Sequence, residues 1–85
     1  MKKVTTLIAR NREFYIVKDE NGYWGIESKY FVNGVLTKKF NGINGHLGKT
    51  VEETLKRTHD TIEIDYLVNE CGMDLMDAMK AHFNF

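Results

Sequence analysis

The sequence predicts an α+β fold in which a four-stranded antiparallel β-meander is followed by two helices packed on one face of the sheet. The N-terminal half contains short β-branched and aromatic runs separated by turn residues. The C-terminal half instead spaces its apolar residues as a helix does, behind a capping signal. We therefore expect a single domain over residues 1–85, with the β-meander at 1–41, a Gly-rich loop at 42–49 and a two-helix segment at 50–85.

The first two strands are predicted over residues 5–9 and 13–17, which flank the polar segment 10–12. β-Branched and aromatic side chains suit a pleated, half-buried strand, so the polar segment between them indicates a hairpin turn. Residues 19–22 then have the sequence Asp-Glu-Asn-Gly. This segment predicts the next turn because its glycine can adopt a positive φ.

The third and fourth strands are predicted over residues 23–32 and 35–40. Asn33 and Gly34 lie between these two runs, and Asn-Gly is the strongest short hairpin signal in a sequence. Lys38 and Lys39 precede Phe40 in the fourth run, where lysines either track phosphates or protect an edge strand from aggregation. Together the four runs complete the predicted meander.

The first helix is expected to begin directly after Thr50. Thr50 and Glu53 have the spacing of a capping box, in which each side chain accepts a hydrogen bond from the backbone N–H of the other residue. Val51, Leu55 and Ile62 then recur at near-helical spacing. These apolar side chains predict the helix face that covers the sheet.

The end of this helix has two interpretations. Residues 61–68 also alternate between polar and apolar types as a strand does, so the helix could stop near His59. We favour one continuous helix because no Gly or Pro interrupts it, and we expect its C-terminal cap at Gly72. A second helix should follow with Asp74 as its N-cap. The apolar stripe of this second helix comprises Met76, Met79 and Phe83.

Length and cysteine content limit the class of protein. A chain of 85 residues with one cysteine forms no intrachain disulfide, which fits a reducing compartment. No secretory signal is evident, and the apolar runs are far shorter than the roughly 20 residues that span a bilayer. We expect a soluble protein without membrane association in the cytoplasm of a bacterial host cell.

Charge divides the chain into two unlike halves although the net charge is zero. Residues 1–42 carry eight basic and four acidic residues, a net charge of +4. The remaining residues carry four basic and eight acidic residues, a net charge of −4. Such a field orients a partner during encounter more than it supplies affinity.

The acidic half supplies the first candidate site. Six carboxylates could form a protein-binding surface that occupies a basic groove on a partner, although clustered acids on a helix are more often a solvated face. These residues are Asp60, Glu63, Asp65, Glu70, Asp74 and Asp77.

A glycine-rich approach to the first helix supplies the alternative site. Residues 42–50 end in Gly-Lys-Thr, but Ile43 stands where a Walker loop requires its first glycine. Free backbone N–H groups at a helix N-terminus can still bind phosphate. The phosphate-binding candidates are Gly45, Gly48, Lys49 and Thr50, assisted by Lys38 and Lys39.

Catalytic and metal-binding patterns are not evident. The histidines and Cys71 do not fall in zinc-ligand spacing. Cys71 and His59 lie twelve positions apart, too far along a helix to act as nucleophile and base. We therefore expect no enzymatic activity, no catalytic residues, no metal and no cofactor.

In size, single cysteine, absence of proline and abundance of Lys, Asn and Ile, the chain resembles the small accessory proteins of low-GC phages and mobile elements, a class that includes anti-CRISPR proteins. The resemblance implies a stoichiometric inhibitor that binds a host protein such as a defence nuclease. We therefore expect a protein–protein interaction module. A small nucleic-acid or phosphate-binding protein is the alternative, although zero net charge makes such binding weak, and a homo-oligomer is also possible.

Overall fold

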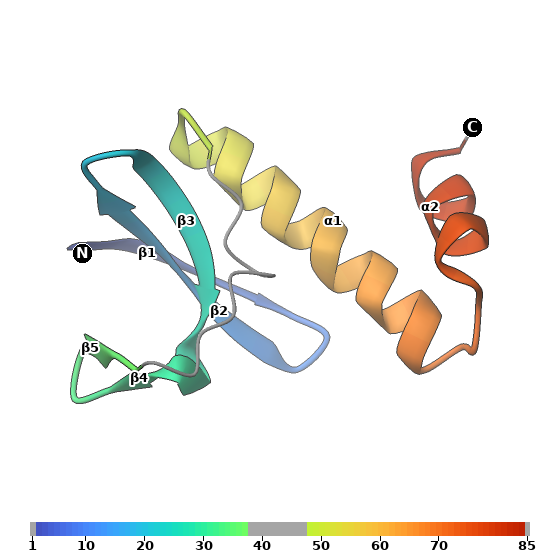
Figure 1. Cartoon of the computed structure of the whole chain (residues 1–85), viewed down its shortest axis with the longest axis horizontal. Helices are drawn as coiled ribbons and strands as arrows, with labels where there is room; N and C mark the ends of the chain where they lie inside the picture. Colours follow the sequence, from blue (N-terminus) through green and yellow to red (C-terminus); the bar gives the residue numbers. More distant parts are fainter. Residues whose placement is uncertain (1, 38–47, 85) are drawn as a thin grey trace.

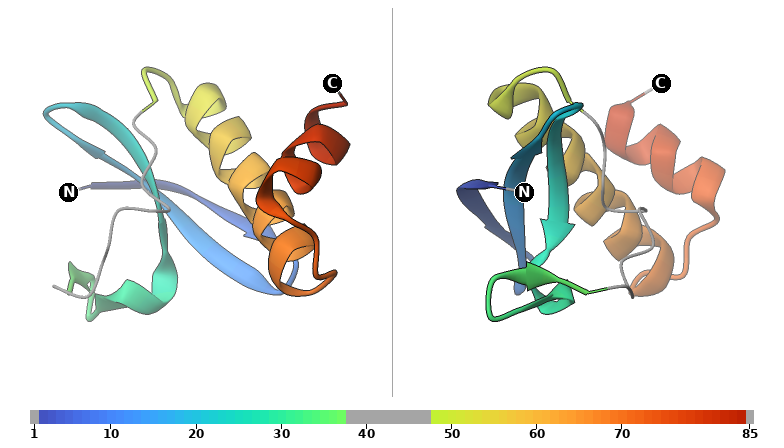
Figure 2. Two further views of the ribbon diagram at one scale, coloured as in Figure 1. Left: turned by 45° about the vertical axis from the view of Figure 1, so that its right-hand side comes forward. Right: turned by 60° about the vertical axis from the view of Figure 1, so that its left-hand side comes forward.

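The computed structural model describes residues 2–37 and 48–84 and has an α+β architecture. Figure 1 shows that α1 lies between the sheet and α2, and the two views of Figure 2 agree with this order. The elements in chain order are β1 (Lys2–Ala9), β2 (Arg12–Asp19), β3 (Gly22–Glu27), the 3₁₀ helix η1 (Ser28–Tyr30), β4 (Phe31–Val32), β5 (Val35–Leu36), α1 (Val51–Asn69) and α2 (Leu75–Phe83).

The first hairpin forms around a two-residue turn, Arg10 and Asn11, and Ala9 pairs with Arg12 across it. Both turn residues have positive φ, 52° and 61°. This conformation matches the twist of the flanking strands, and Asn adopts it more readily than most residues. The hairpin agrees with the prediction, but its strands are longer than the predicted ones because Lys2 and Lys3 also pair, with Lys18 and Val17.

The second turn is held by the side chain of Asp19. Its Oδ1 accepts hydrogen bonds from the backbone N–H groups of Asn21 (2.8 Å) and Gly22 (3.1 Å). Its Oδ2 accepts from the indole N–H of Trp24 at 3.0 Å. Because a carboxylate can satisfy several donors at once, Asp19 fixes both the turn and the Trp24 ring.

The four-stranded meander is a prediction that the structure corrects. Within residues 2–37 and 48–84 the main sheet has three strands in the order β1-β2-β3, and β4 pairs with β5 in a separate two-stranded sheet. The run predicted as the third strand stops at Glu27, and η1 turns the chain before Phe31. The Phe31 ring then lies 5.2 Å from the Tyr15 ring of β2. Tyr30 and Phe31, which the predicted third strand included, therefore belong to a turn and to a short hairpin that packs back on the sheet.

The Asn33-Gly34 turn is present as predicted. Both residues have positive φ, 52° and 80°, and Val32 pairs with Val35 across the turn. Val32 and Val35 remain 57% and 67% exposed. Lys38, Lys39 and the rest of the predicted fourth strand lie outside the described residues.

The centre of the sheet is packed on both faces. Ile16 pairs with Gly25, and Gly25 faces Thr58 of α1 so closely that no side chain fits between them. Neighbouring residues on a strand point to opposite faces, which places Val17 and Ile26 on the side away from α1. All of these residues are buried. The core is therefore formed by strands β2 and β3 together with one face of α1.

The continuous first helix is confirmed. Thr50 is the N-cap of α1, and its hydroxyl accepts a hydrogen bond from the Glu53 N–H at 3.1 Å. Thr54, Thr58 and Ile62 are its buried residues, a spacing of four that places them on one face. Residues 61–68 alternate in polarity like a strand, although they are helical, because some of their apolar residues also contact α2.

The second helix packs on α1 and not on the sheet, which corrects the prediction that both helices cover one face. Gly72, with a φ of 70°, turns the chain after α1, and Asp74 caps α2 by accepting from the Met76 N–H at 3.1 Å. Ala78 is the buried residue of α2. A nine-residue helix that buries one small residue completely leaves most of its surface outside the core.

Candidate functional site

The first charged feature near α1 is an ion-pair cluster centred on Arg12. Its guanidinium donates two hydrogen bonds of 2.9 Å to Glu27 and one of 2.7 Å to Asp65. Glu27 is only 7% exposed, and Lys29 lies 3.8 Å from it. Arg12 therefore joins the end of the first hairpin, the end of β3 and the C-terminal half of α1.

Arg10 forms a second link between the hairpin and α1. Its guanidinium donates to both oxygens of Glu63, at 2.8 and 3.0 Å, and lies 3.6 Å from the centre of the Tyr66 ring. The two partners of Arg10 lie almost one helical turn apart on α1. Two arginines thus align the hairpin turn along the helix.

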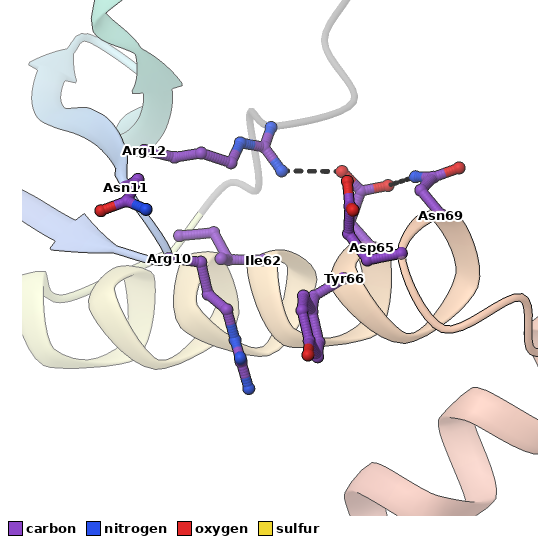
Figure 3. A pocket seen from close by; sticks show the side chains of 8 residues that line it. Arg10, Asn11, Arg12, Ile62, Asp65, Tyr66 and Asn69 are labelled. Carbon is purple, nitrogen blue, oxygen red and sulfur yellow. Dashed lines mark hydrogen bonds and ion pairs between the residues drawn. The ribbon is translucent and has the colours of Figure 1, made fainter.

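A surface cavity of about 550 Å³ lies where these arginines meet α1. Figure 3 shows Arg12 reaching from the hairpin toward Asp65, which in turn accepts a hydrogen bond of 2.7 Å from Asn69. Arg10 and Tyr66 lie on the same wall of the cavity. Both arginines already have carboxylate partners, so the side chains around this cavity mainly hold the hairpin against the helix.

A third ion-pair cluster holds α2 on α1. Asp60 Oδ1 lies 2.8 Å from Nε2 of His82, and Asp60 Oδ2 accepts from Lys56 at 3.0 Å. The side chains of Asp60 and His82 are both about one-fifth exposed. This contact joins the last turn of α2 to the middle of α1.

Glu27, Asp60 and Glu63 have lowered pKa values, and in Glu63 the hydrogen bond from Arg10 is the main cause. The other two carboxylates are more buried. Hydrogen bonds from Arg12 lower the pKa of Glu27 below its ordinary value and outweigh burial, which acts in the opposite direction. Burial alone would raise the pKa of Asp60, but hydrogen bonds from His82 and Lys56 outweigh it and the pKa is lowered. Both groups are therefore held as carboxylates by the folded structure.

The six carboxylates predicted as a protein-binding surface fall into two groups. Asp60, Glu63 and Asp65 pair with basic residues of the chain itself. The other three are exposed and have no cationic partner within the described ranges. These exposed residues are Glu70, Asp74 and Asp77.

Two of the exposed carboxylates, Asp74 and Asp77, flank an exposed apolar pair in the chain at the start of α2, and Glu70 precedes them at the end of α1. Leu75 is 55% exposed and Met76 is 58% exposed. We call these two residues, together with Glu70, Asp74 and Asp77, the α2 surface. It lies at the end of the molecule opposite the start of β1 (Figure 1). The sequence placed Met76 in an apolar stripe, but Leu75 was not identified because its exposure depends on how little of α2 packs on α1.

The phosphate-binding candidates within the described residues have structural contacts. Gly48 exchanges two backbone hydrogen bonds with Tyr23, at 2.9 and 3.0 Å, and packs against Thr54 where no side chain would fit. The Lys49 N–H donates to the Glu53 carboxylate at 3.3 Å, and the Thr50 hydroxyl caps the helix. Gly45, Lys38 and Lys39 lie outside the described residues.

The described residues form neither a metal site nor a membrane-spanning helix. In the part of the chain that the structure describes, no three His, Cys, Asp or Glu residues gather as a metal site would require. Neither helix there has the length and apolar character needed to cross a membrane. Cys71 is a free, exposed thiol beyond the end of α1.

Comparison with protein-family models, curated proteins and solved structures finds no match.

Proposed function

We propose that this protein is a non-catalytic interaction module that binds another protein through the α2 surface. The observation that carries the proposal is the exposure of Leu75 and Met76 between Asp74 and Asp77, two carboxylates that have no cationic partner among the described residues. Burying one such apolar side chain stabilises a complex by roughly 1.5–3 kcal/mol. Two adjacent ones on a helix make a suitable centre for an interface, with charged residues at its rim.

The charge of this surface supports a basic partner. Asp60, Glu63 and Asp65 form ion pairs with basic residues of the chain itself. The unpaired negative charge of the helical segment therefore lies mainly around α2. A basic groove that normally holds nucleic acid has the complementary potential. Combined with the resemblance to phage and mobile-element proteins, this supports stoichiometric inhibition of a host protein such as a defence nuclease.

Phosphate or nucleic-acid binding by the Gly-Lys-Thr loop has less support. The N–H groups of Gly48 and Lys49 already donate within the chain, and Glu53 places a carboxylate beside them. A bound phosphate would have to displace that carboxylate and overcome its repulsion.

The proposal is tested by capture of partners from a host lysate. Tagged protein is incubated with lysate of a low-GC bacterium, with and without nuclease treatment, and the retained proteins are identified. We expect a protein partner that survives nuclease treatment and is released by salt, because the rim of the α2 surface is charged. Capture that disappears after nuclease treatment would instead indicate nucleic acid as the primary ligand and contradict the proposal.

A further inference from the structure

A mostly apolar groove of about 280 Å³ runs between α1 and α2. Met79 and Phe83 line it from α2, and four residues line it from α1: Arg57, Asp60, Thr61 and Ile64. On each helix these residues are three or four positions apart, the spacing that places side chains on one face. The surface of the groove is therefore mostly apolar where the two helices meet. Its two charged lining residues are paired within the chain: Arg57 with Glu53, and Asp60 with Lys56 and His82.

The groove is large enough for one bulky side chain. A cavity of about 150 Å³ lined by apolar residues holds a benzene ring. The groove exceeds that size, and Ile64 and Met79 are only half-buried beside it. Methionine adapts its shape to different neighbours, so Met79 can adjust to aliphatic or aromatic occupants.

The α2 surface lies about one helical turn from the groove along α2. Met76 precedes Met79 by three positions and extends the same stripe toward the start of α2. Asp74 and Asp77 flank Met76 in the chain and are exposed. A partner segment that binds along the groove would therefore contact apolar residues in the groove and carboxylates near the start of α2.

We infer that the α1–α2 groove receives a bulky apolar side chain from a basic amphipathic helix of the partner. The apolar stripe takes the side chain, and the partner's basic residues face the carboxylates of the α2 surface. This is the helix-in-groove mode of recognition, in which a few apolar anchors supply most of the affinity. The inference rests on the proposed function and adds the chemistry of the partner.

The groove is tested with a lysine–leucine peptide that forms a basic amphipathic helix, and with the same peptide after every leucine is replaced by serine. Binding to the full chain is measured by fluorescence anisotropy. Thr61→Leu fills the groove with a larger side chain and should weaken binding of the leucine peptide by about tenfold. His59→Leu adds the same side chain to an exposed position of α1 away from the groove, and should leave binding unchanged.

Methyl NMR of the unmodified protein supplies a second readout that does not depend on a variant folding correctly. The leucine peptide should shift the methyl signals of Ile64 and Met79 and leave those of Val32 and Val35 in place. Any of three results would overturn the inference. Thr61→Leu could bind the leucine peptide with full affinity, the serine peptide could bind the protein as tightly as the leucine peptide, or the methyl shifts could be confined to Val32 and Val35. A dimer of the protein alone that Thr61→Leu dissociates would also overturn it, because the groove would then hold a second copy.

The inference and the proposed function fail in different ways. If a lysate partner depends on Leu75 and Met76 but binds Thr61→Leu normally, the groove is not used and the proposed function stands. If no protein partner survives nuclease treatment, the proposed function itself fails.

Discussion

Gly25 of β3 and Thr58 of α1 are packed so closely that a Cβ atom at position 25 would overlap the Thr58 Oγ1 atom. The Thr58 hydroxyl is buried there and has no hydrogen-bond partner among the residues that the structure describes. The contact sets how near α1 approaches the sheet. It also leaves an unsatisfied polar atom in the core, which normally costs stability.

Gly25→Ala should therefore destabilise the fold by about 2 kcal/mol, because the added methyl group forces α1 away from β3. Urea unfolding followed by circular dichroism measures the change. In the background of Thr58→Ala the same substitution should cost much less, since the overlapping atoms are gone. Equal costs in both backgrounds would mean that α1 does not contact Gly25 as described.

Thr58→Val should increase the free energy of unfolding by about 1 kcal/mol. Valine keeps the shape of threonine while replacing the unpaired hydroxyl with a methyl group, which removes the cost of burying that hydroxyl. The same urea experiment provides the value. A loss of stability would show that the hydroxyl has a partner in solution.

Arg12→Met should lower the free energy of unfolding by about 2 kcal/mol. The substitution leaves the buried Glu27 carboxylate without its two hydrogen bonds, and an unpaired buried charge is costly. Arg10→Met serves as the matched control, because its ion pair with Glu63 is more exposed and more strongly screened by solvent. Similar losses in the two variants would contradict the special role of Arg12.

Acid should destabilise the protein as the pH falls below the ordinary pKa of glutamate, 4.5. The folded state lowers the pKa of Glu27, so the unfolded chain takes up a proton first and stability decreases as acid is added. Urea unfolding between about pH 6 and about pH 3 measures the slope. Arg12→Met should flatten it, and an unchanged slope would assign the acid sensitivity to other carboxylates, such as Asp60.

Parts of the fold could be predicted because their signals are local. Thr50, Asn33 with Gly34, and Asp74 each act within a few residues of chain, and each has its expected role. The other half of the predicted capping box differs, because the Glu53 side chain accepts from the Lys49 N–H and not from the Thr50 N–H. The end of the third strand could not be predicted from such local signals. Its apolar and aromatic pattern continues through η1, and the break at Glu27 coincides with an ion pair to Arg12, fifteen positions away.

The candidate site was harder to predict, because charge pairing connects distant segments. Arg12 and Asp65 are 53 positions apart, and nothing in the local sequence indicates that they meet. The opposite charges of the two halves were evident, but the sequence does not reveal which carboxylates are paired. Only the folded arrangement separates Asp65, which is paired, from Asp77, which is exposed without a described partner.

The α2 surface is tested most directly by capture of the lysate partner, after nuclease treatment, with three forms of the protein. Leu75→Ser/Met76→Ser removes the exposed apolar pair of α2, while Val32→Ser/Val35→Ser removes a similarly exposed pair from the β4–β5 hairpin. We predict that the wild type and the valine variant retain the partner and that the α2 variant loses it. Retention by the α2 variant, or loss only in the valine variant, would contradict the assignment of binding to α2.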